Sequence, residues 1–138
     1  MAGLCRTGES LGIEALVLPS RALVTTDAFK KQSVTSERWL RLLEVARGDV
    51  ATFLAEQRAA GYTIIALEQA SNSQPLQRFQ FPRRTVLLLG NEQNGVPVPL
   101  LPLCDACLEI PMLGTTRSLN AHVSGALATW QYAQQWAL

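Results

Sequence analysis

Two short polar segments contain most of the side chains that suggest chemistry. The first, Gly90 to Gly95, directly follows the apolar run Thr85 to Leu89 and includes Glu92. Glycine lets a backbone approach a ligand closely, and open parallel sheets bind ligands at the carboxyl ends of their strands. The same residue types also occur where a chain merely turns after a strand. The segment has neither a GxGxxG pattern nor a Walker loop, which disfavours nicotinamide and nucleoside-triphosphate binding.

The second segment, Arg117 to Asn120, precedes a long apolar stretch and predicts a helix that begins at Ser118. Ser118 is a good N-cap, because its hydroxyl accepts a hydrogen bond from an otherwise unpaired amide. Free amides at a helix N-terminus, together with serine and asparagine side chains, also hold polar ligands. Local sequence alone favours simple capping, with Asn120 in solvent.

Three further sites have candidate chemistry and a simpler explanation. Arg6, near Glu9, has the pattern of a surface ion pair. His122 is the only histidine, and its side chain type suits acid–base catalysis, although a single helical histidine is more often structural. Cys104 and Cys107 resemble half of a zinc site, but tetrahedral zinc needs further ligands. We therefore interpret them as core thiols and predict no metal.

Composition limits the class of protein. With 138 residues, 48% of them apolar, the chain is long enough for one domain with its own core. It has no apolar run of membrane length and no signal-peptide pattern. Its three cysteines are an odd number, which disfavours a disulfide framework. We expect an intracellular protein of the cytoplasm or nucleus that does not contact membranes.

The net charge restricts how the chain binds nucleic acid. A formal charge of +1 is low for a protein that binds nucleic acid through the electrostatic field of its total charge. Any such contact must be local, or must come from a partner subunit or a region outside this chain. The basic residues available for a local contact are Arg6, Lys30, Lys31, Arg78, Arg83, Arg84 and Arg117.

Apolar runs alternate with helical patterns along the chain. Runs that are apolar on both faces are typical of parallel sheets covered by helices, so the pattern predicts an α/β domain with a mostly parallel sheet flanked by helices. One stretch, Ala70 to Arg84, resembles a long loop. Strands are predicted at Ile13–Leu18, Thr63–Leu67, Thr85–Leu89 and Cys107–Met112, and helices at Ala51–Ala60 and from Ser118 onward. Along the last helix, one apolar stripe comprises Leu119, Val123, Ala126, Leu127, Trp130, Ala133 and Ala137.

Taken together, three ordered segments resemble the motifs of the SpoU family of the SPOUT superfamily, the RNA ribose 2'-O-methyltransferases. The resemblance covers practically the whole chain and is strongest to the eukaryotic branch that methylates tRNA guanosine. Each motif alone is weak, whereas three in order at compatible spacings are specific. The segments are Gly3–Thr7, Leu88–Pro97, and Ile110–Met112 followed by Arg117–Ala126.

The resemblance implies a fold and a cofactor that composition could not reveal. In this family the C-terminal segment forms a deep trefoil knot, an exception to the rule against knots. The knot would bind S-adenosylmethionine in a bent conformation, mainly through backbone groups, without a metal. By position, Leu67, Gly90, Ile110 and Leu119 would line this pocket. The family is dimeric, so the resemblance also implies a homodimer with each active site near the subunit interface.

The resemblance further implies roles for four catalytic residues. Arg6 would accept the proton of the ribose 2'-hydroxyl, and Glu92, Ser118 and Asn120 would position Arg6 or the ribose. Alternatively Arg6 binds the adjacent phosphate, because a guanidinium does not readily release its proton. The expected partner is structured RNA, with a guanosine of the tRNA D-loop as the first choice.

The family's first motif includes an asparagine upstream of the position where this chain starts. We therefore expect residues 1–138 to form a single methyltransferase domain, the C-terminal part of a longer protein. An alternative is a catalytically inactive RNA-binding or scaffold domain that retains the fold. A third interpretation, a small-molecule enzyme that uses His122 or Cys104, has little support.

Overall fold

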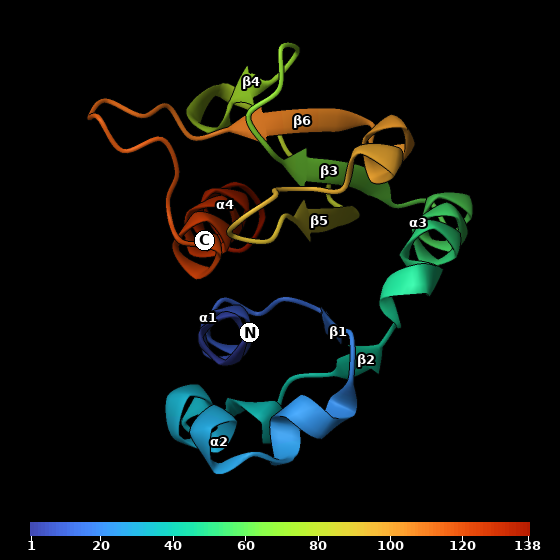
Figure 1. The fold of residues 1–138 in the computed structure, drawn as a ribbon, viewed down its shortest axis with the longest axis vertical. Coiled ribbons are helices and arrows are strands. Elements are labelled where there is room, and N and C mark those ends of the chain that lie inside the picture. The colour runs from blue at the N-terminus through green and yellow to red at the C-terminus, as the bar shows by residue number, and fades with distance from the viewer. The chain divides into compact units, whose positions relative to one another are not determined.

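The computed structural model describes all residues 1–138, which divide into two compact units, Met1–Val50 and Ala51–Leu138 (Figure 1). Each unit pairs its strands in parallel and packs helices beside them. The predicted class, an α/β fold with parallel sheets flanked by helices, is confirmed. None of the helices combines the length and apolar character that crossing a membrane requires.

The first unit contains two helices and a two-stranded parallel sheet. Its core contains Cys5 from the first helix, Phe29 from the second and Leu40 before the second strand. The first strand starts at Leu16 rather than at the predicted Ile13, because the chain turns through Gly12 at a φ of 71° before it extends. The elements are α1 (Ala2–Ser10), β1 (Leu16–Leu18), α2 (Asp27–Ser33) and β2 (Leu42–Glu44).

The second unit is built on a four-stranded parallel sheet with the order β4-β6-β3-β5. The predicted strands Thr63–Leu67 and Thr85–Leu89 are confirmed at both ends. The strand predicted at Cys107–Met112 is shorter, since pairing ends at Glu109, before Pro111. The elements are α3 (Val50–Ala59), β3 (Thr63–Leu67), β4 (Gln74–Pro75), β5 (Thr85–Leu89), β6 (Ala106–Glu109) and α4 (Ala121–Trp136).

The central strand β3 buries side chains on both faces of this sheet. Ile65 packs in a cluster that includes Ala128 of α4. Ala66, the next residue, points to the opposite face and packs in a cluster with Val96 and Cys107. Strand β3 is thus covered on both sides, which explains why its sequence is apolar throughout rather than alternating.

The parallel register determines where the loops leave the sheet. Leu67 at the end of β3 pairs with Leu89 at the end of β5 and with Leu108 in β6. Because parallel strands end at the same edge, the segments that begin at Glu68 and Gly90 emerge side by side. The segment after β6 leaves at this edge as well, and it extends away from the sheet before it returns to α4 (Figure 1).

Helix α4 leaves the large side chains of the predicted apolar stripe exposed. Large stripe members such as Val123, Leu127 and Trp130 are 44%, 41% and 46% exposed. The buried positions are the small residues Gly125, Ala128 and Ala133, and of these only Ala133 belongs to the stripe. Small side chains let the helix axis approach the sheet closely, so the face that packs on the sheet is the less hydrophobic one.

The segment predicted as a long loop is partly regular. Gln74–Pro75 forms β4 at the edge of the sheet, next to β6, and Leu76–Arg78 forms a 3-10 turn. Leu76 and Phe81 are buried in the cluster that contains Ile65. The segment is therefore anchored to the core at two points.

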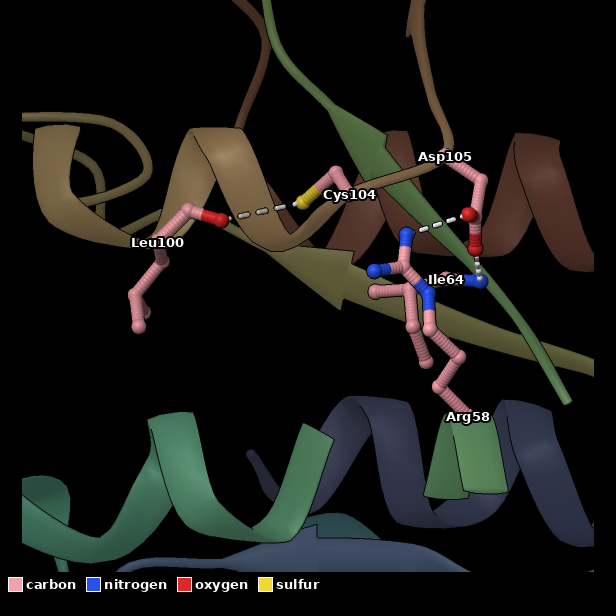
Figure 2. Close-up of polar contacts among 5 residues, drawn as sticks. All are labelled: Arg58, Ile64, Leu100, Cys104 and Asp105. Carbon is pink, nitrogen blue, oxygen red and sulfur yellow. Dashed lines mark hydrogen bonds and ion pairs between the residues drawn. The ribbon is translucent and has the colours of Figure 1, made fainter. Parts of the chain in front are cut away.

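Asp105 connects α3 to the start of β3 (Figure 2). Its carboxylate accepts a hydrogen bond from the Ile64 amide at 2.7 Å and forms an ion pair with Arg58. Burial acts to raise the pKa of Asp105, but these bonds from Ile64 and Arg58 outweigh it and hold the pKa below the ordinary value of 3.8. Beside it, the Cys104 thiol donates to the Leu100 carbonyl at 3.4 Å, and burial raises the pKa of Cys104 to about 11.

The lowered pKa of Asp105 predicts a specific loss of stability in acid. A carboxyl group whose pKa is lower when folded stabilises the fold above its unfolded pKa, and this contribution disappears as pH falls through the folded pKa. Urea unfolding of D105N should therefore show a shallower loss of stability between about pH 4 and pH 2 than the parent chain. At neutral pH the cost should be at most about 1 kcal/mol. D49N, at an exposed aspartate of the first unit, is the control, and parallel curves for D105N and the parent would contradict the assignment.

Candidate active site

A cavity of about 320 Å³ opens at the carboxyl edge of the four-stranded sheet. Its walls come from three stretches of chain: the ends of β3 and β5 with the residues after them, and the path from β6 to α4. This is the edge at which parallel sheets bind ligands, and the volume lies at the lower end of the range of small-molecule sites.

The cavity brings together most of the residues predicted from sequence. All four predicted cofactor-binding positions line it, although they lie far apart in the chain: Leu67, Gly90, Ile110 and Leu119. Two of the predicted catalytic residues, Glu92 and Ser118, also line it. Asn120 does not line the cavity itself but donates a hydrogen bond to Glu92, which does. Arg6 lies exposed on α1 in the first unit, and its approach to the cavity stays a prediction.

The loop after β5 is a closed turn that positions Glu92. The backbones of Asn91 and Gly95 exchange two hydrogen bonds, of 3.2 and 3.1 Å. The Asn91 side-chain oxygen also accepts from the amides of Gln93 and Asn94, at 3.0 and 2.6 Å. Gly95 closes the turn at a φ of 67°, a conformation that glycine adopts without strain. The turn therefore presents Glu92 from a fixed backbone.

Glu68 is a site residue that the sequence analysis missed. Its carboxylate accepts a hydrogen bond from the Val96 amide at 2.6 Å, which fixes the far side of the turn to the end of β3. A Cβ added to Gly95 would collide with this carboxylate, so the glycine leaves the space that Glu68 fills. The available signal was positional: an acidic residue directly follows a buried strand, next to Leu67.

Asn120, and not Ser118 as predicted, is the N-cap of α4. Its side-chain oxygen accepts from the amides of His122 and Val123 at 2.8 and 3.4 Å. Its side-chain nitrogen donates to Glu92 at 3.1 Å, so Asn120 is exposed to solvent but also has a partner in the turn after β5. One asparagine thus joins the start of α4 to the turn after β5, while Ser118 is free to face the cavity.

Two substitutions should separate the two bonds of Asn120. N120A removes both the cap and the bond to Glu92, and we expect it to destabilise the chain by about 1 to 2 kcal/mol. N120S retains a capping oxygen and loses only the bond to Glu92, so it should recover most of that stability. Urea unfolding measures both, and S118A is the matched control at the position that does not cap. Equal losses for N120S and N120A would contradict a separate capping role.

The charge of the cavity is one-sided. Three glutamates, Glu68, Glu92 and Glu109, are among its lining residues, and no lysine, arginine or histidine is. Such a wall favours a cationic or hydrogen-bond-donating ligand over an anion. Neither His122 nor Cys104 lines the cavity, and Cys107 is buried in the core cluster beside Ala66.

Comparison with known proteins identifies the family. The model of the SpoU rRNA Methylase family matches residues 1–130. The chain belongs to this family. The two SpoU motifs of the second unit both contribute residues to the cavity.

Two SpoU relatives are similar over 98% of this chain. The mouse tRNA (guanosine(18)-2'-O)-methyltransferase TARBP1 is 44% identical, and the tRNA (guanosine(18)-2'-O)-methyltransferase of Saccharomyces cerevisiae is 38% identical. The chain spans only 8% and 10% of the length of these two proteins. The resemblance to the eukaryotic branch that the sequence predicts is therefore confirmed for this region.

A solved SpoU structure has the same fold and contains the cofactor that the motifs imply. The methyltransferase AviRb from Streptomyces viridochromogenes, in complex with AdoMet (S-adenosylmethionine), superposes with a TM-score of 0.82 at 27% identity. The match covers 97% of this chain and 54% of AviRb.

Proposed function

We propose that this chain is an S-adenosylmethionine-dependent methyltransferase domain that modifies a ribose 2'-hydroxyl in RNA, with a tRNA guanosine as the target. One observation carries the proposal: the residues of two separated SpoU motifs and the end of β3 meet around a single cavity at the carboxyl edge of the sheet. The SpoU relatives named as tRNA guanosine 2'-O-methyltransferases support the choice of substrate.

The cavity fits the cofactor in both shape and charge. S-adenosylmethionine supplies a methyl group on a positively charged sulfonium, and the lining residues include three glutamates and no lysine, arginine or histidine. The turn packs so tightly that a Cβ on Gly90 would overlap the backbone of Gly95 and Val96. A glycine at this point leaves backbone groups as the wall, which suits a ligand held largely by main-chain hydrogen bonds.

The residues of the chain have separable roles in this reaction. The new bond joins the ribose oxygen to the methyl carbon while the carbon–sulfur bond breaks and its electron pair returns to sulfur. The cavity aligns the reacting groups, which is the proximity effect. Two of its lining residues serve this role: Glu92 lies on a fixed turn and is bonded to the α4 cap, and Ser118 precedes that cap. Arg6 takes up the proton of the 2'-hydroxyl or binds the neighbouring phosphate, as the family motif implies.

We infer further that the chain acts as a homodimer with the family's trefoil knot, inside the cell where its RNA partner is found. The exposed side chains of α4 support the dimer, since Val123, Leu127 and Trp130 form an apolar face on one helix. The inference of a knot rests on membership of the SpoU family. Sedimentation velocity on the purified chain tests the dimer directly.

Two assays test the proposal. Calorimetric titration should show one S-adenosylmethionine bound per protomer. Incubation with radiolabelled cofactor and an unmodified tRNA transcript, followed by nuclease digestion, should yield 2'-O-methylguanosine. A transcript already methylated at that ribose is the matched control. Cofactor binding without transfer would favour the inactive RNA-binding alternative, and no binding by a folded sample would reject the cofactor site.

A further inference from the structure

The segment between Glu68 and Glu92 concentrates positive charge in a nearly neutral chain. It contains Arg78, Arg83 and Arg84 and no acidic residue, whereas the whole chain has 12 basic and 11 acidic side chains. We refer to residues 78–84 as the arginine turn. Because like charges repel, a cluster of arginines without acidic neighbours lowers the stability of the fold. Such a cluster therefore suggests a function, such as binding an anionic partner.

Helix α4 holds the arginine turn in place. Tyr132 donates its hydroxyl hydrogen to the Arg83 carbonyl at 2.6 Å. The other bonds are those of Gln135 Nε2 to the Phe79 carbonyl, the Phe81 amide to Gln135 Oε1, and Trp136 Nε1 to the Phe81 carbonyl, each 2.8 Å long. Phe81 itself is buried. The backbone that carries the arginines is therefore ordered before any partner arrives.

The arginine side chains are exposed and have no acidic partner. The ion pairs of Arg41 with Glu14 and of Arg58 with Asp105 involve none of them. Arg83 instead lies over the Trp136 ring, 5.6 Å from its centroid, and this ring is 43% exposed.

Arg84 is partly engaged by its own unit. It lies 4.6 Å from the Tyr62 ring centroid and donates to the Ala60 carbonyl at 2.9 Å. Arg78, and Arg83 apart from its contact with the exposed Trp136 ring, are thus the side chains best placed to bind a ligand.

We propose that the arginine turn is a docking surface for the phosphate backbone of an RNA, an inference that rests on the proposed function. Guanidinium groups bind phosphate oxygens in a bidentate geometry, and exposed aromatic rings beside arginine offer a stacking surface for unpaired bases. An acidic peptide would match the charge but would leave Trp136 without a stacking partner. A turn fixed by α4 also loses little entropy when it binds.

This surface lies away from the reacting ribose. Arg84 immediately precedes β5, and the cavity begins after the other end of that strand, at Leu89 and Gly90. The strand covers four residue steps, about 13 Å at about 3.3 Å per residue. The arginine turn therefore contributes affinity for the RNA and leaves the chemical step unchanged.

The test is a double charge reversal, R78E/R83E, in the complete chain. Fluorescence anisotropy with a labelled tRNA transcript, at several KCl concentrations, should show Kd raised at least about tenfold and a salt slope reduced by about 2. R47E, at an exposed arginine of the first unit, controls for a general charge effect. R83K should raise Kd less than R78E/R83E does, because a lysine retains the charge but loses the bidentate geometry of the guanidinium.

The outcomes separate this surface from the proposed function. If the parent and R78E/R83E bind S-adenosylmethionine equally while only the variant loses tRNA affinity, the surface is supported. Unchanged tRNA affinity in R78E/R83E, an equal loss in R47E, or no tRNA binding by the parent would overturn it, even if cofactor binding is intact. A selective loss of binding to polyglutamate or to phosphatidylserine vesicles, with tRNA unaffected, would overturn it in favour of those partners.

Discussion

Replacing Gly90 with alanine should weaken S-adenosylmethionine binding by at least about 100-fold, the size of effect expected when a site shifts by about 1 Å. A Cβ at this position would lie 2.5 Å from the Val96 nitrogen and 2.6 Å from the Gly95 Cα. Both are backbone atoms, and Glu68 fixes the Val96 amide, so no flexible side chain can move aside. The turn has to open, and with it the wall of the cavity.

Gly114 provides the matched control. It lies in the segment before α4, and a Cβ added there would meet nothing within 4 Å. G114A should therefore bind the cofactor within about twofold of the parent, and calorimetry on both variants makes the comparison. Urea unfolding shows whether G90A remains folded when binding is measured. Parental affinity in a folded G90A would mean that the turn after β5 is not part of the cofactor site.

Strands β3 and β5 were predictable because a short continuous run of β-branched and leucine residues is typical of a strand in a parallel sheet. The three central residues of β3 are buried, whereas β5 lies at the edge of the sheet and is half-buried throughout. Strand β4 was not predictable. It contains only Gln74 and Pro75, too few residues for any periodicity, and only its pairing with β6 defines it.

Helix α4 shows why hydrophobicity alone does not identify the face of a helix that packs on the sheet. The 3.6-residue pattern ranks positions by the size of their apolar side chains, and so it selected Leu127 and Trp130. The sheet instead packs against Gly125 and Ala128, where the absence of bulk permits close approach. The large side chains remain on the outer face, which is the reason a second subunit is expected there.

Most residues of the site were predictable from the sequence, but the hydrogen bonds that join them were not. Ser118 and Asn120 are equally good capping residues by type, and local sequence does not choose between them. The choice depends on Glu92, which lies 28 residues earlier and accepts the second bond of Asn120. Glu68 was missed for the same reason: its role appears only when the loop after β5 returns to the end of β3.

Substituting Arg6 with alanine should lower kcat for methyl transfer to tRNA about 10²- to 10⁴-fold, the usual range for loss of a general base. Because the family motif assigns Arg6 to the ribose or its phosphate and not to the cofactor, the affinity for S-adenosylmethionine should change less than twofold. Single-turnover kinetics with saturating tRNA, alongside calorimetry, measure the two effects separately. R47A, at an exposed arginine of the same unit, is the control and should retain parental kinetics.

R6K then distinguishes the two roles that the motif allows for Arg6. A lysine preserves a point charge for phosphate but not the planar geometry of the guanidinium. If Arg6 only binds the adjacent phosphate, R6K should recover most of kcat with a raised KM for tRNA. If Arg6 takes the proton of the 2'-hydroxyl, kcat in R6K should stay as low as in R6A. Full activity in R6A would remove Arg6 from the reaction and leave proton transfer to water or to the RNA phosphate, with the chain supplying alignment alone.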